Sequence, residues 1–396
     1  MSAVASSRKS SLSVAVVGAG VIGLSVALEL RGRGADVVVY DRGVELGAGV
    51  TIRAAGMLGA AFEWAAEEDQ RALAALAQHA GKLWADFAGR LERLGGGPVE
   101  YSSEGTLVIA RTPAELDWLL TLTAACQKRG MPALTLPQKD LAVREPALAG
   151  DRVSALLLPD DQQVDPVLVL QRLGSALARM GVGLRFGRHI ERITVGQHFL
   201  MPDGERFDRV VLANGAQAAP HFVGPRGAAL APDLPTPVPV KGQMLALAPL
   251  SGDLRHVIHA RDVYIAPKAR WVLVGATSER GRADADVDRT AIDQLRVRAA
   301  DLVPALADAP ELTAWAGVRP GSPDDQPLIG ETAIPGLFAA LGHYRNGVLF
   351  APATAEIIAD QVIDGKVSPL AAAFDPRRFD KADATPHSPS GTGFDN

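Results

Sequence analysis

The residues with the clearest chemical meaning are three glycines near the start of the chain. Gly18, Gly20 and Gly23 form a GxGxxG turn between an apolar run and a segment with helical spacing, and the acid Asp41 ends the next apolar run. In such a βαβ unit the glycines permit a tight turn, close approach of the backbone to a pyrophosphate, and close helix packing. The acid accepts hydrogen bonds from ribose hydroxyls. The pattern predicts a dinucleotide site, and the alternative is a glycine-rich turn that binds no ligand.

The segment after this unit favours a flavin over a nicotinamide. Residues 47–63 read GAGVTIRAAGMLGAAFE, which is small, glycine-rich and without helical or strand periodicity. Because glycine has no Cβ, such a stretch allows the backbone to approach a bulky planar ring. A later strand, RVVLANGA, returns the chain to the core and ends at Gly215. Together these features favour FAD lying extended through the domain.

Two arginines and a tyrosine could hold a small carboxylate. Arg319 lies in WAGVRPG, Tyr264 in VYIAP, and Arg345 in GHYRNGVLF, just before an apolar helix. A guanidinium binds a carboxylate through two parallel, charge-assisted hydrogen bonds. The alternatives are a surface turn for Arg319, capping of carbonyls or flavin contact for Arg345, and a core or rim position for Tyr264. We nominate no side-chain base, since a neutral amine can react without one.

The spacing of apolar residues predicts the elements that position these groups. Residues three and four apart predict helices at 21–34, 67–94, 113–129, 165–180 and 288–303. Asp165 is the expected N-cap of the fourth helix, and Pro166 occupies its first position. Short apolar runs predict parallel strands, covered on both faces, at 12–17, 36–40, 208–213 and 336–341. Residues 99–110 indicate a hairpin, and antiparallel-looking strands fill 235–277.

Parallel and antiparallel strands therefore alternate along the chain. We predict an α/β fold in which one domain is built from discontinuous pieces and a second, α+β domain is inserted. The FAD-binding domain is expected to take residues 12–90, 145–230 and 315–374. The substrate-binding domain takes 91–144 and 231–314, and the termini, 1–11 and 375–396, are expected to be flexible.

Composition excludes several classes of protein. The net charge is −5 with both signs mixed along the chain, which gives no electrostatic footprint for nucleic acid. No apolar run approaches the length of a membrane span. Cys126 is the only cysteine, which excludes an internal disulfide and fits the cytoplasm; we expect a buried position in a helix. His256 and His259 have a metal-like spacing, but no carboxylate or cysteine cluster accompanies them. We therefore predict exposed strand-end histidines and no metal site.

Eight motifs resemble those of the FAD-dependent amino-acid oxidases of the D-amino-acid oxidase type, among which glycine oxidase of the thiamine pathway is the nearest relative. They are GAGVIG (18–23), AAGMLGA (54–60), LPDDQQVDP (158–166), PVKGQMLAL (239–247), VYIAP (263–267), VGAT (274–277), WAGVRPGSPDDQPLIG (315–330) and GHYRNGVLFAPATAE (342–356). The resemblance implies a glutathione-reductase-type, FAD-binding Rossmann domain interleaved with an antiparallel-sheet substrate domain.

The resemblance also implies which residues contact FAD. They are Gly18, Gly20, Val21, Ile22, Gly23, Asp41, Arg42, Ala55, Gly56, Met57, Ile190, His343, Tyr344, Arg345, Asn346, Gly347, Val348 and Leu349. Ile190 would offer its backbone to the adenine, and the turn from His343 to Leu349 would close over the isoalloxazine.

The same resemblance assigns the substrate carboxylate to Arg319, assisted by Tyr264 and Arg345. Two positions stand apart. Arg53 occurs where small residues are usual, so that it either pairs with FAD phosphates or faces solvent. Ser278, which follows VGAT, has no assigned role.

These assignments imply oxidation of glycine, sarcosine or a small D-amino acid. A hydride would move from the α-carbon to flavin N5, the imino acid would hydrolyse to an oxo acid with ammonia or an amine, and oxygen would yield hydrogen peroxide. One alternative is a dehydrogenase of the same fold that passes electrons to a quinone or a protein. Another is a flavoprotein whose FAD is structural, against which the carboxylate clamp argues. Assembly into a homo-oligomer stays open, and a role in thiamine formation is implied by similarity alone.

Overall fold

The computed structural model describes residues 11–64, 70–149, 154–250 and 254–379. Most of the two termini that we predicted to be flexible lies outside these ranges. Residues 375–379 of the predicted C-terminal tail do have regular structure, because they include the 3₁₀ turn η5 (Pro376–Phe379). Arg378 in this turn forms an ion pair with Asp324, with 2.8 Å between Nε and Oδ2.

One large sheet is mostly parallel, with the order β21-β22-β12-β1-β2-β8. Its neighbouring strands run parallel except β21, which is antiparallel to β22. The strands are β1 (Ser13–Val17), β2 (Asp36–Tyr40), β8 (Gly183–Arg185), β12 (Arg209–Leu212), β21 (Leu328–Glu331) and β22 (Leu337–Leu341). The four strands predicted from continuous apolar runs are β1, β2, β12 and β22. Burial on both faces explains why their sequences do not alternate.

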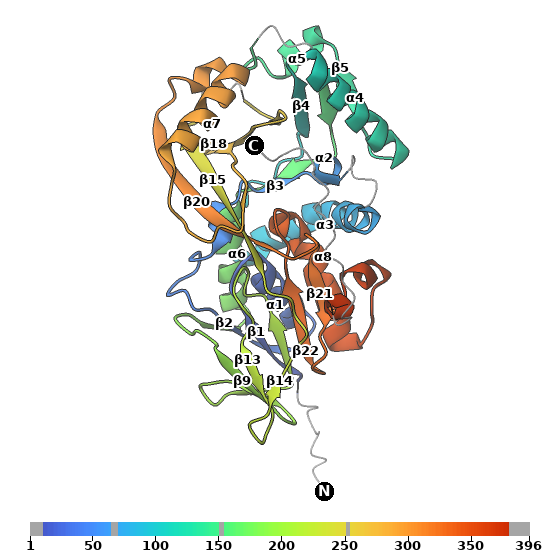
Figure 1. Ribbon diagram of the computed structural model, residues 1–396, viewed down its shortest axis with the longest axis vertical. Helices are drawn as coiled ribbons and strands as arrows, with labels where there is room; N and C mark the ends of the chain where they lie inside the picture. Colours follow the sequence, from blue (N-terminus) through green and yellow to red (C-terminus); the bar gives the residue numbers. More distant parts are fainter. Residues whose placement is uncertain (1–10, 65–69, 150–153, 251–253, 380–396) are drawn as a thin grey trace, which may run out of the picture.

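Two layers cover this parallel sheet. Val14 and Val16 pack on one face with side chains of α1, α3, α6 and α8. Ala15 and Tyr40 pack on the other face against a five-stranded sheet with the order β11-β10-β9-β13-β14, which lies at the lower end of the molecule in Figure 1. Its strands are β9 (Arg192–Val195), β10 (Phe199–Leu200), β11 (Arg206–Phe207), β13 (His221–Val223) and β14 (Ala229–Leu230).

A second large sheet occupies the upper half of Figure 1. Its order is β19-β15-β18-β17-β16-β4-β6-β5, and β20 pairs with β15 on the side. Its neighbours are antiparallel except β16 and β4. The strands are β4 (Thr106–Ala110), β5 (Leu134–Leu136), β6 (Ser154–Leu158), β15 (Val238–Leu247), β16 (Val257–His259), β17 (Tyr264–Lys268), β18 (Trp271–Gly275), β19 (Glu279–Arg280) and β20 (Glu311–Gly321). The predicted combination of a parallel sheet with an antiparallel one is confirmed.

The helices predicted from three-and-four spacing are present. The helices are α1 (Val21–Gly32), α2 (Ala60–Trp64), α3 (Arg71–Gly95), α4 (Pro113–Lys128), α5 (Gln138–Arg144), α6 (Pro166–Arg179), α7 (Arg289–Leu302) and α8 (Gly347–Ala359), with the short turns η1 (Val50–Arg53), η2 (Pro304–Leu306), η3 (Asp360–Asp364), η4 (Pro369–Phe374) and η5. Asp165 caps α6 as predicted, since its Oδ1 accepts a hydrogen bond from the Val167 amide at 2.8 Å. Cys126 is buried in α4, as expected.

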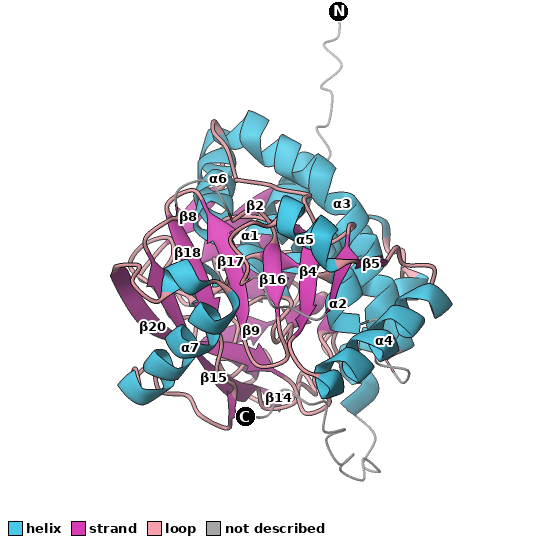
Figure 2. Ribbon diagram, turned by 90° about the horizontal axis from the view of Figure 1, so that it is seen from above, coloured by secondary structure: helices cyan, strands magenta, loops and turns pink. Residues whose placement is uncertain are grey.

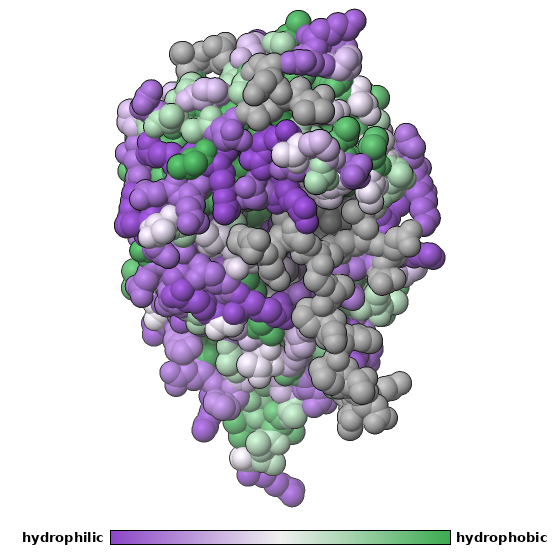
Figure 3. Space-filling view, turned by 45° about the horizontal axis from the view of Figure 1, so that its top comes forward, coloured by the Kyte–Doolittle hydropathy of each residue, from purple (hydrophilic) through white to green (hydrophobic). Residues whose placement is uncertain are grey.

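The nine-stranded sheet has one covered face and one that helps to form a cavity. Ile258 and Ile265 pack with side chains of α5 and α7 on the covered face. On the other face, Val108 and Ala110 pack with α4. Figure 2 shows these helices around the sheet. Figure 3 shows hydrophilic residues over much of one side of the molecule, with hydrophobic residues in small groups between them.

Two sequence-based expectations are wrong. Residues 99–110 do not form a hairpin, because only β4 is a strand and Ser102 instead forms a bridge with Gln163 next to the short pair β3 (Met57–Leu58) and β7 (Gln162–Gln163). His256 and His259 are buried rather than exposed, because β16 lies inside the sheet between β17 and β4.

The proposed domain division stays a prediction, and sheet pairing suggests different limits for it. β6 and β20 fall within or across the segments that we assigned to the FAD-binding domain, yet both pair inside the nine-stranded sheet. A division that follows the sheets would give both strands to the substrate-binding domain.

Candidate active site

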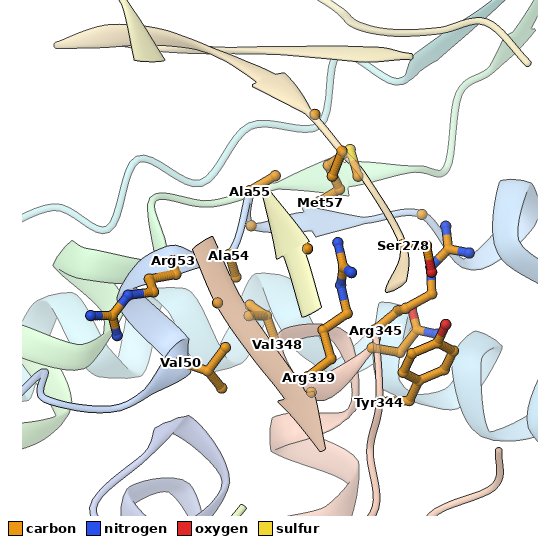
Figure 4. A pocket seen from close by; sticks show the side chains of 18 of the residues that line it. Val50, Arg53, Ala54, Ala55, Met57, Ser278, Arg319, Tyr344, Arg345 and Val348 are labelled. Carbon is orange, nitrogen blue, oxygen red and sulfur yellow. The ribbon is translucent and has the colours of Figure 1, made fainter. Parts of the chain in front are cut away.

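A cavity of about 590 Å³ lies between the two large sheets. One wall comes from the turn after β1 and from residues at the carboxyl end of β22, which is where open α/β sheets bind ligands. The other wall comes from β15, β17, β18 and β20 of the nine-stranded sheet. Figure 4 shows side chains from both sheets and from the turn before α8 around this space.

The glycine turn is shaped by backbone contacts. The Gly18 amide donates a hydrogen bond to the Tyr40 carbonyl at 2.7 Å, and Gly18 has a φ of +116°. A Cβ on Gly18 would lie 2.2 Å from the Ala213 carbonyl oxygen, and a Cβ on Gly23 would lie 1.9 Å from the Gly18 oxygen. Larger residues at these two positions would collide with the main chain. Gly20 differs, because it lines the cavity and leaves its backbone open to a ligand.

The amino end of α1 suits an anionic group. Gly20 is its N-cap and provides no side chain to satisfy the first amides, and no acid lies in the first turn. The Val21 amide donates to Thr51 Oγ1 at 3.1 Å. Amides at a helix start and the helix dipole together favour a phosphate. The turn and the helix therefore fit the pyrophosphate of a dinucleotide.

Asp41 is held at the end of β2 by backbone amides. Its Oδ2 accepts a hydrogen bond from the Ala19 amide at 2.6 Å, and its Oδ1 accepts one from the Gly43 amide at 2.7 Å. Each carboxylate oxygen can accept more than one hydrogen bond. The fixed carboxylate therefore retains capacity for the ribose hydroxyls predicted at this position.

Most of the residues predicted to contact FAD line the cavity, namely Gly20, Val21, Ile22, Ala55, Gly56, Met57, His343, Tyr344, Arg345, Asn346, Gly347 and Val348. Six do not line it, namely Gly18, Gly23, Asp41, Arg42, Ile190 and Leu349. Arg42 is exposed, Ile190 is buried in the core beside β2, and the Leu349 carbonyl accepts a hydrogen bond from Trp84 Nε1 at 2.9 Å. Roles for these six residues stay predictions.

The turn before α8 has a fixed conformation. Tyr344 has a φ of +48°, and its amide donates to the Pro320 carbonyl at 2.9 Å. Nε2 of the buried His343 lies 3.0 Å from Thr354 Oγ1 in α8. Burial lowers the pKa of His343 to about 3, so the imidazole is neutral near neutral pH. These contacts place the turn against the cavity.

Arg319 and Tyr264 each lie over a glycine of a neighbouring strand. Arg319 Nη1 donates a hydrogen bond to the Thr277 carbonyl at 3.1 Å, and a Cβ on Gly242 would lie 2.2 Å from the same Nη1. A Cβ on Gly275 would lie 2.4 Å from the Tyr264 hydroxyl. The absence of two side chains therefore makes room for two polar groups in the cavity.

The remaining arginines differ in their positions. Arg345 is exposed at the edge of the cavity, and its charge reaches the interior, where it contributes to the lowered pKa of His259. Arg53 Nη1 donates to the Gly49 carbonyl at 3.0 Å. Figure 4 shows Arg53 pointing away from Arg319 and Arg345. The structure thus ties the Arg53 guanidinium to its own loop.

Sequence reasoning missed His259 as a cavity residue. Its ring stacks on Phe62 with centroids 3.8 Å apart and lies 5.5 Å from the Tyr264 ring. Burial, followed by the charge of Arg345, lowers its pKa to about 3. Among the described residues, no group of three or more histidine, cysteine or acidic side chains could hold a metal ion. Gly242 and Gly275 were also missed, although a glycine inside a strand is a known signal of close approach.

Comparison with known proteins agrees with this geometry. Residues 13–361 match the DAO family, described as FAD dependent oxidoreductase. The glycine oxidase of Geobacillus kaustophilus is 33% identical over 358 residues, which cover 88% of this chain and 92% of that protein. The bifunctional protein ThiO/ThiG of Nostoc sp. is 33% identical over 378 residues, 94% of this chain, but the chain spans only 56% of its length.

The solved structures lead to the same family. The crystal structure of glycine oxidase from Geobacillus kaustophilus matches with a TM-score of 0.83 at 31% identity, and the match covers 92% of this chain and 98% of that one. The glycine oxidase of Bacillus cereus matches with a TM-score of 0.78 at 27% identity, over 90% of this chain and 96% of that one. These matches confirm the predicted fold, and FAD as the cofactor. The chain belongs to the DAO family of FAD-dependent oxidoreductases.

Proposed function

We propose that the protein oxidises glycine, sarcosine or a small D-amino acid, with oxygen as the electron acceptor. The observation that carries this proposal is the Arg319 guanidinium inside the cavity, held over Gly242 by the Thr277 carbonyl. A fixed guanidinium favours a substrate with a carboxylate. The names of the glycine oxidases that resemble the chain support the choice of a small amino acid.

The residues around the glycine turn would hold FAD. The amides at the start of α1 would bind the pyrophosphate, Asp41 would bind the ribose of the adenosine half, and the segment Ala55–Met57 with the turn before α8 would contact the isoalloxazine. When bound, FAD accepts the hydride from the α-carbon and passes two electrons to oxygen, which takes up protons and becomes hydrogen peroxide.

The nine-stranded sheet would hold the substrate. Arg319 would pair with the carboxylate and Tyr264 would donate a hydrogen bond to it, with Arg345 adding positive charge at the cavity edge. This arrangement fixes the α-carbon in one orientation. The ammonium must lose a proton before it reacts, and water reaching the cavity can accept it. The oxidised imino acid then takes up water and releases ammonia or an amine.

The setting of this activity is also a proposal. Among the residues that the structure describes, no helix is long and apolar enough to cross a membrane. We propose a cytoplasmic enzyme. Because the chain spans little more than half of the ThiO/ThiG proteins, an association with the other activity of those proteins is likewise a proposal.

An anaerobic absorbance experiment tests the proposed function. The purified holoenzyme is mixed with glycine, sarcosine and D-alanine without oxygen, and the flavin band near 450 nm is followed (roughly its usual position for a protein-bound flavin). We expect at least one of these amino acids to bleach the band, and oxygen to restore it with release of peroxide. Bleaching by none of them would overturn the proposal. Bleaching that only a quinone or dye reverses would reject oxygen as the acceptor.

A further inference from the structure

Two polar side chains of the nine-stranded sheet are buried at the cavity without an internal partner. The exposed fractions of His259 and Thr106 are 5% and 3%, and both residues line the cavity. Within the described part of the chain, neither side chain has a hydrogen-bond partner. Buried polar side chains are nearly always hydrogen-bonded, so an unpartnered pair that faces a cavity indicates a ligand that supplies the missing bonds.

The strand register places these two groups on the same face. β4 runs parallel to β16, with Thr106 beside Val257 and Val108 beside His259. Because side chains alternate along a strand, Thr106, Val108, Val257 and His259 all point to the cavity side of the sheet. In the next pair, His259 lies opposite Tyr264. A row of polar groups therefore crosses three adjacent strands.

This row leads away from the proposed carboxylate clamp. The Tyr264 hydroxyl reaches toward β15, where it donates to Met244 Sδ at 3.5 Å, and Arg319 lies on β20 beyond β15. His259 and Thr106 lie on the opposite side of Tyr264, toward β4. Glycine held by Arg319 and Tyr264 has no side chain to extend in this direction. A larger amino acid could place its side chain there.

The charge state of the pair indicates what kind of side chain it would accept. His259 is neutral near neutral pH, because burial and the charge of Arg345 oppose its protonation. A neutral imidazole offers one donor and one acceptor, and a threonine hydroxyl offers both. Phe62 stacks on the imidazole and limits its movement. Two neutral groups of this kind match a hydroxyl better than a charged group or an alkyl chain.

We infer that Thr106 and His259 form a side-chain subsite that selects small amino acids bearing a hydroxyl group over alkyl analogues of the same size. This inference rests on the proposed function, and it defines the substrate class more narrowly. An amino acid with a hydroxyl on its β-carbon satisfies the buried pair, whereas the matching alkyl side chain leaves both groups without partners. Sites built to bond a hydroxyl discriminate strongly against analogues that lack it.

The test compares D-serine with D-2-aminobutyrate, whose side chains differ in having a hydroxyl or a methyl group at the end. We expect the wild-type holoenzyme to oxidise D-serine with a kcat/KM at least ~10-fold higher. In Thr106→Val and His259→Phe this ratio should fall at least ~5-fold, while Thr106→Ser and His259→Gln, which retain hydrogen-bonding groups, should preserve most of it. Since the ratio is taken within each protein, a general loss of activity or folding cancels.

The outcomes separate this inference from the proposed function. If glycine bleaches the flavin but the wild type shows no preference for D-serine, the subsite is rejected and the amino-acid oxidase stands. The same conclusion follows if Thr106→Val and His259→Phe leave the ratio unchanged, since contact with the amine would slow both substrates alike. If no amino acid bleaches the flavin, the proposed function fails and the subsite is rejected with it.

Discussion

The glycine turn after β1 and the cavity face of the nine-stranded sheet both depend on glycine, but for different reasons. At Gly18 and Gly23 a Cβ would meet backbone carbonyl groups at 2.2 and 1.9 Å. At Gly242 and Gly275 a Cβ would meet the ends of the Arg319 and Tyr264 side chains at 2.2 and 2.4 Å. The distances are similar, yet the atoms that would have to move are not.

This difference separates cofactor binding from substrate binding. A backbone carbonyl cannot move without the strand and helix that carry it, because the turn is hydrogen-bonded to the Tyr40 carbonyl. The end of an arginine or tyrosine side chain can move by changing rotamer. Substitution in the turn should therefore damage the fold and FAD binding. Substitution in the sheet should displace only the groups that we assign to the substrate.

The largest expected effect is that of Gly23→Ala. The new Cβ would lie 1.9 Å from the Gly18 oxygen, so α1 must move away from β1. We expect loss of bound FAD and destabilisation of roughly 4 kcal/mol or more. Absorbance of the purified protein and urea unfolding measure both. The control is Gly49→Ala, where a Cβ would have no described atom within 4 Å. Normal FAD content in Gly23→Ala would show that the turn tolerates a side chain.

Arg319→Ala should keep FAD and lose substrate. Losing a buried charge-assisted pair typically costs about 2–5 kcal/mol, which corresponds to a fall in kcat/KM of roughly 30- to several thousand-fold. We expect most of this as a higher KM for glycine, measured by oxygen consumption. Arg53→Ala is the matched control, since Arg53 lines the same cavity but its guanidinium binds the Gly49 carbonyl. An unchanged KM in Arg319→Ala would remove the residue from the substrate site.

Gly242→Ala tests the comparison most directly. Its Cβ would lie 2.2 Å from Arg319 Nη1, and the guanidinium can escape by rotating away from the Thr277 carbonyl. We expect a fall in kcat/KM of about 10- to 100-fold, less than in Arg319→Ala, because a displaced charge still attracts the carboxylate. FAD content and stability should stay near those of the wild type.

The control for Gly242→Ala is Gly59→Ala in the same cavity. There a Cβ would make an ordinary contact, 3.5 Å from Asp161 Oδ2. If Gly242→Ala lost FAD as Gly23→Ala is expected to, the distinction between backbone and side-chain collisions would be wrong.

The two regions also differ in how well the sequence predicted them. The glycine turn is local: its residues follow one another, and their spacing alone predicted a helix start, an acid at the next strand end and a dinucleotide. The substrate wall is non-local. Its groups come from four strands, and the register that places Tyr264 opposite both His259 and Gly275 cannot be read from any one segment. Resemblance predicted Arg319 and Tyr264, but not the glycines beneath them.

The wrong predictions have the same cause. His259 appeared as an exposed strand end because its own segment is short and polar, whereas β4 and β17, distant in sequence, bury it on both sides. The hairpin at 99–110 failed because Ser102 bonds Gln163 rather than its neighbours in sequence. In both places, pairing with distant strands overrode the local pattern.

The smallest expected effect concerns pH, and each region supplies one histidine. Burial lowers the pKa of His343 in the turn before α8 and of His259 in the sheet to about 3, against an ordinary value of 6.5. Between these values the unfolded chain binds more protons than the folded one. The free energy of unfolding therefore rises with pH from about 3 to 6.5 and is lost as the pH falls.

Each buried histidine should make the protein about 1.4 kcal/mol less stable at pH 5.5 than at pH 7.5. His343→Gln keeps a polar group near Thr354 but cannot become charged, so its loss of stability over this interval should be smaller by that amount in urea unfolding with excess FAD. His259→Gln should behave alike if its imidazole is equally shielded, and less so if water in the cavity reaches the ring. His189→Gln, at a site with 60% of its side chain exposed, is the control. Equal pH dependence in wild type and His343→Gln would contradict a neutral imidazole in the turn. A difference between the His343 and His259 variants would instead show that the wall facing the substrate is the wetter of the two regions.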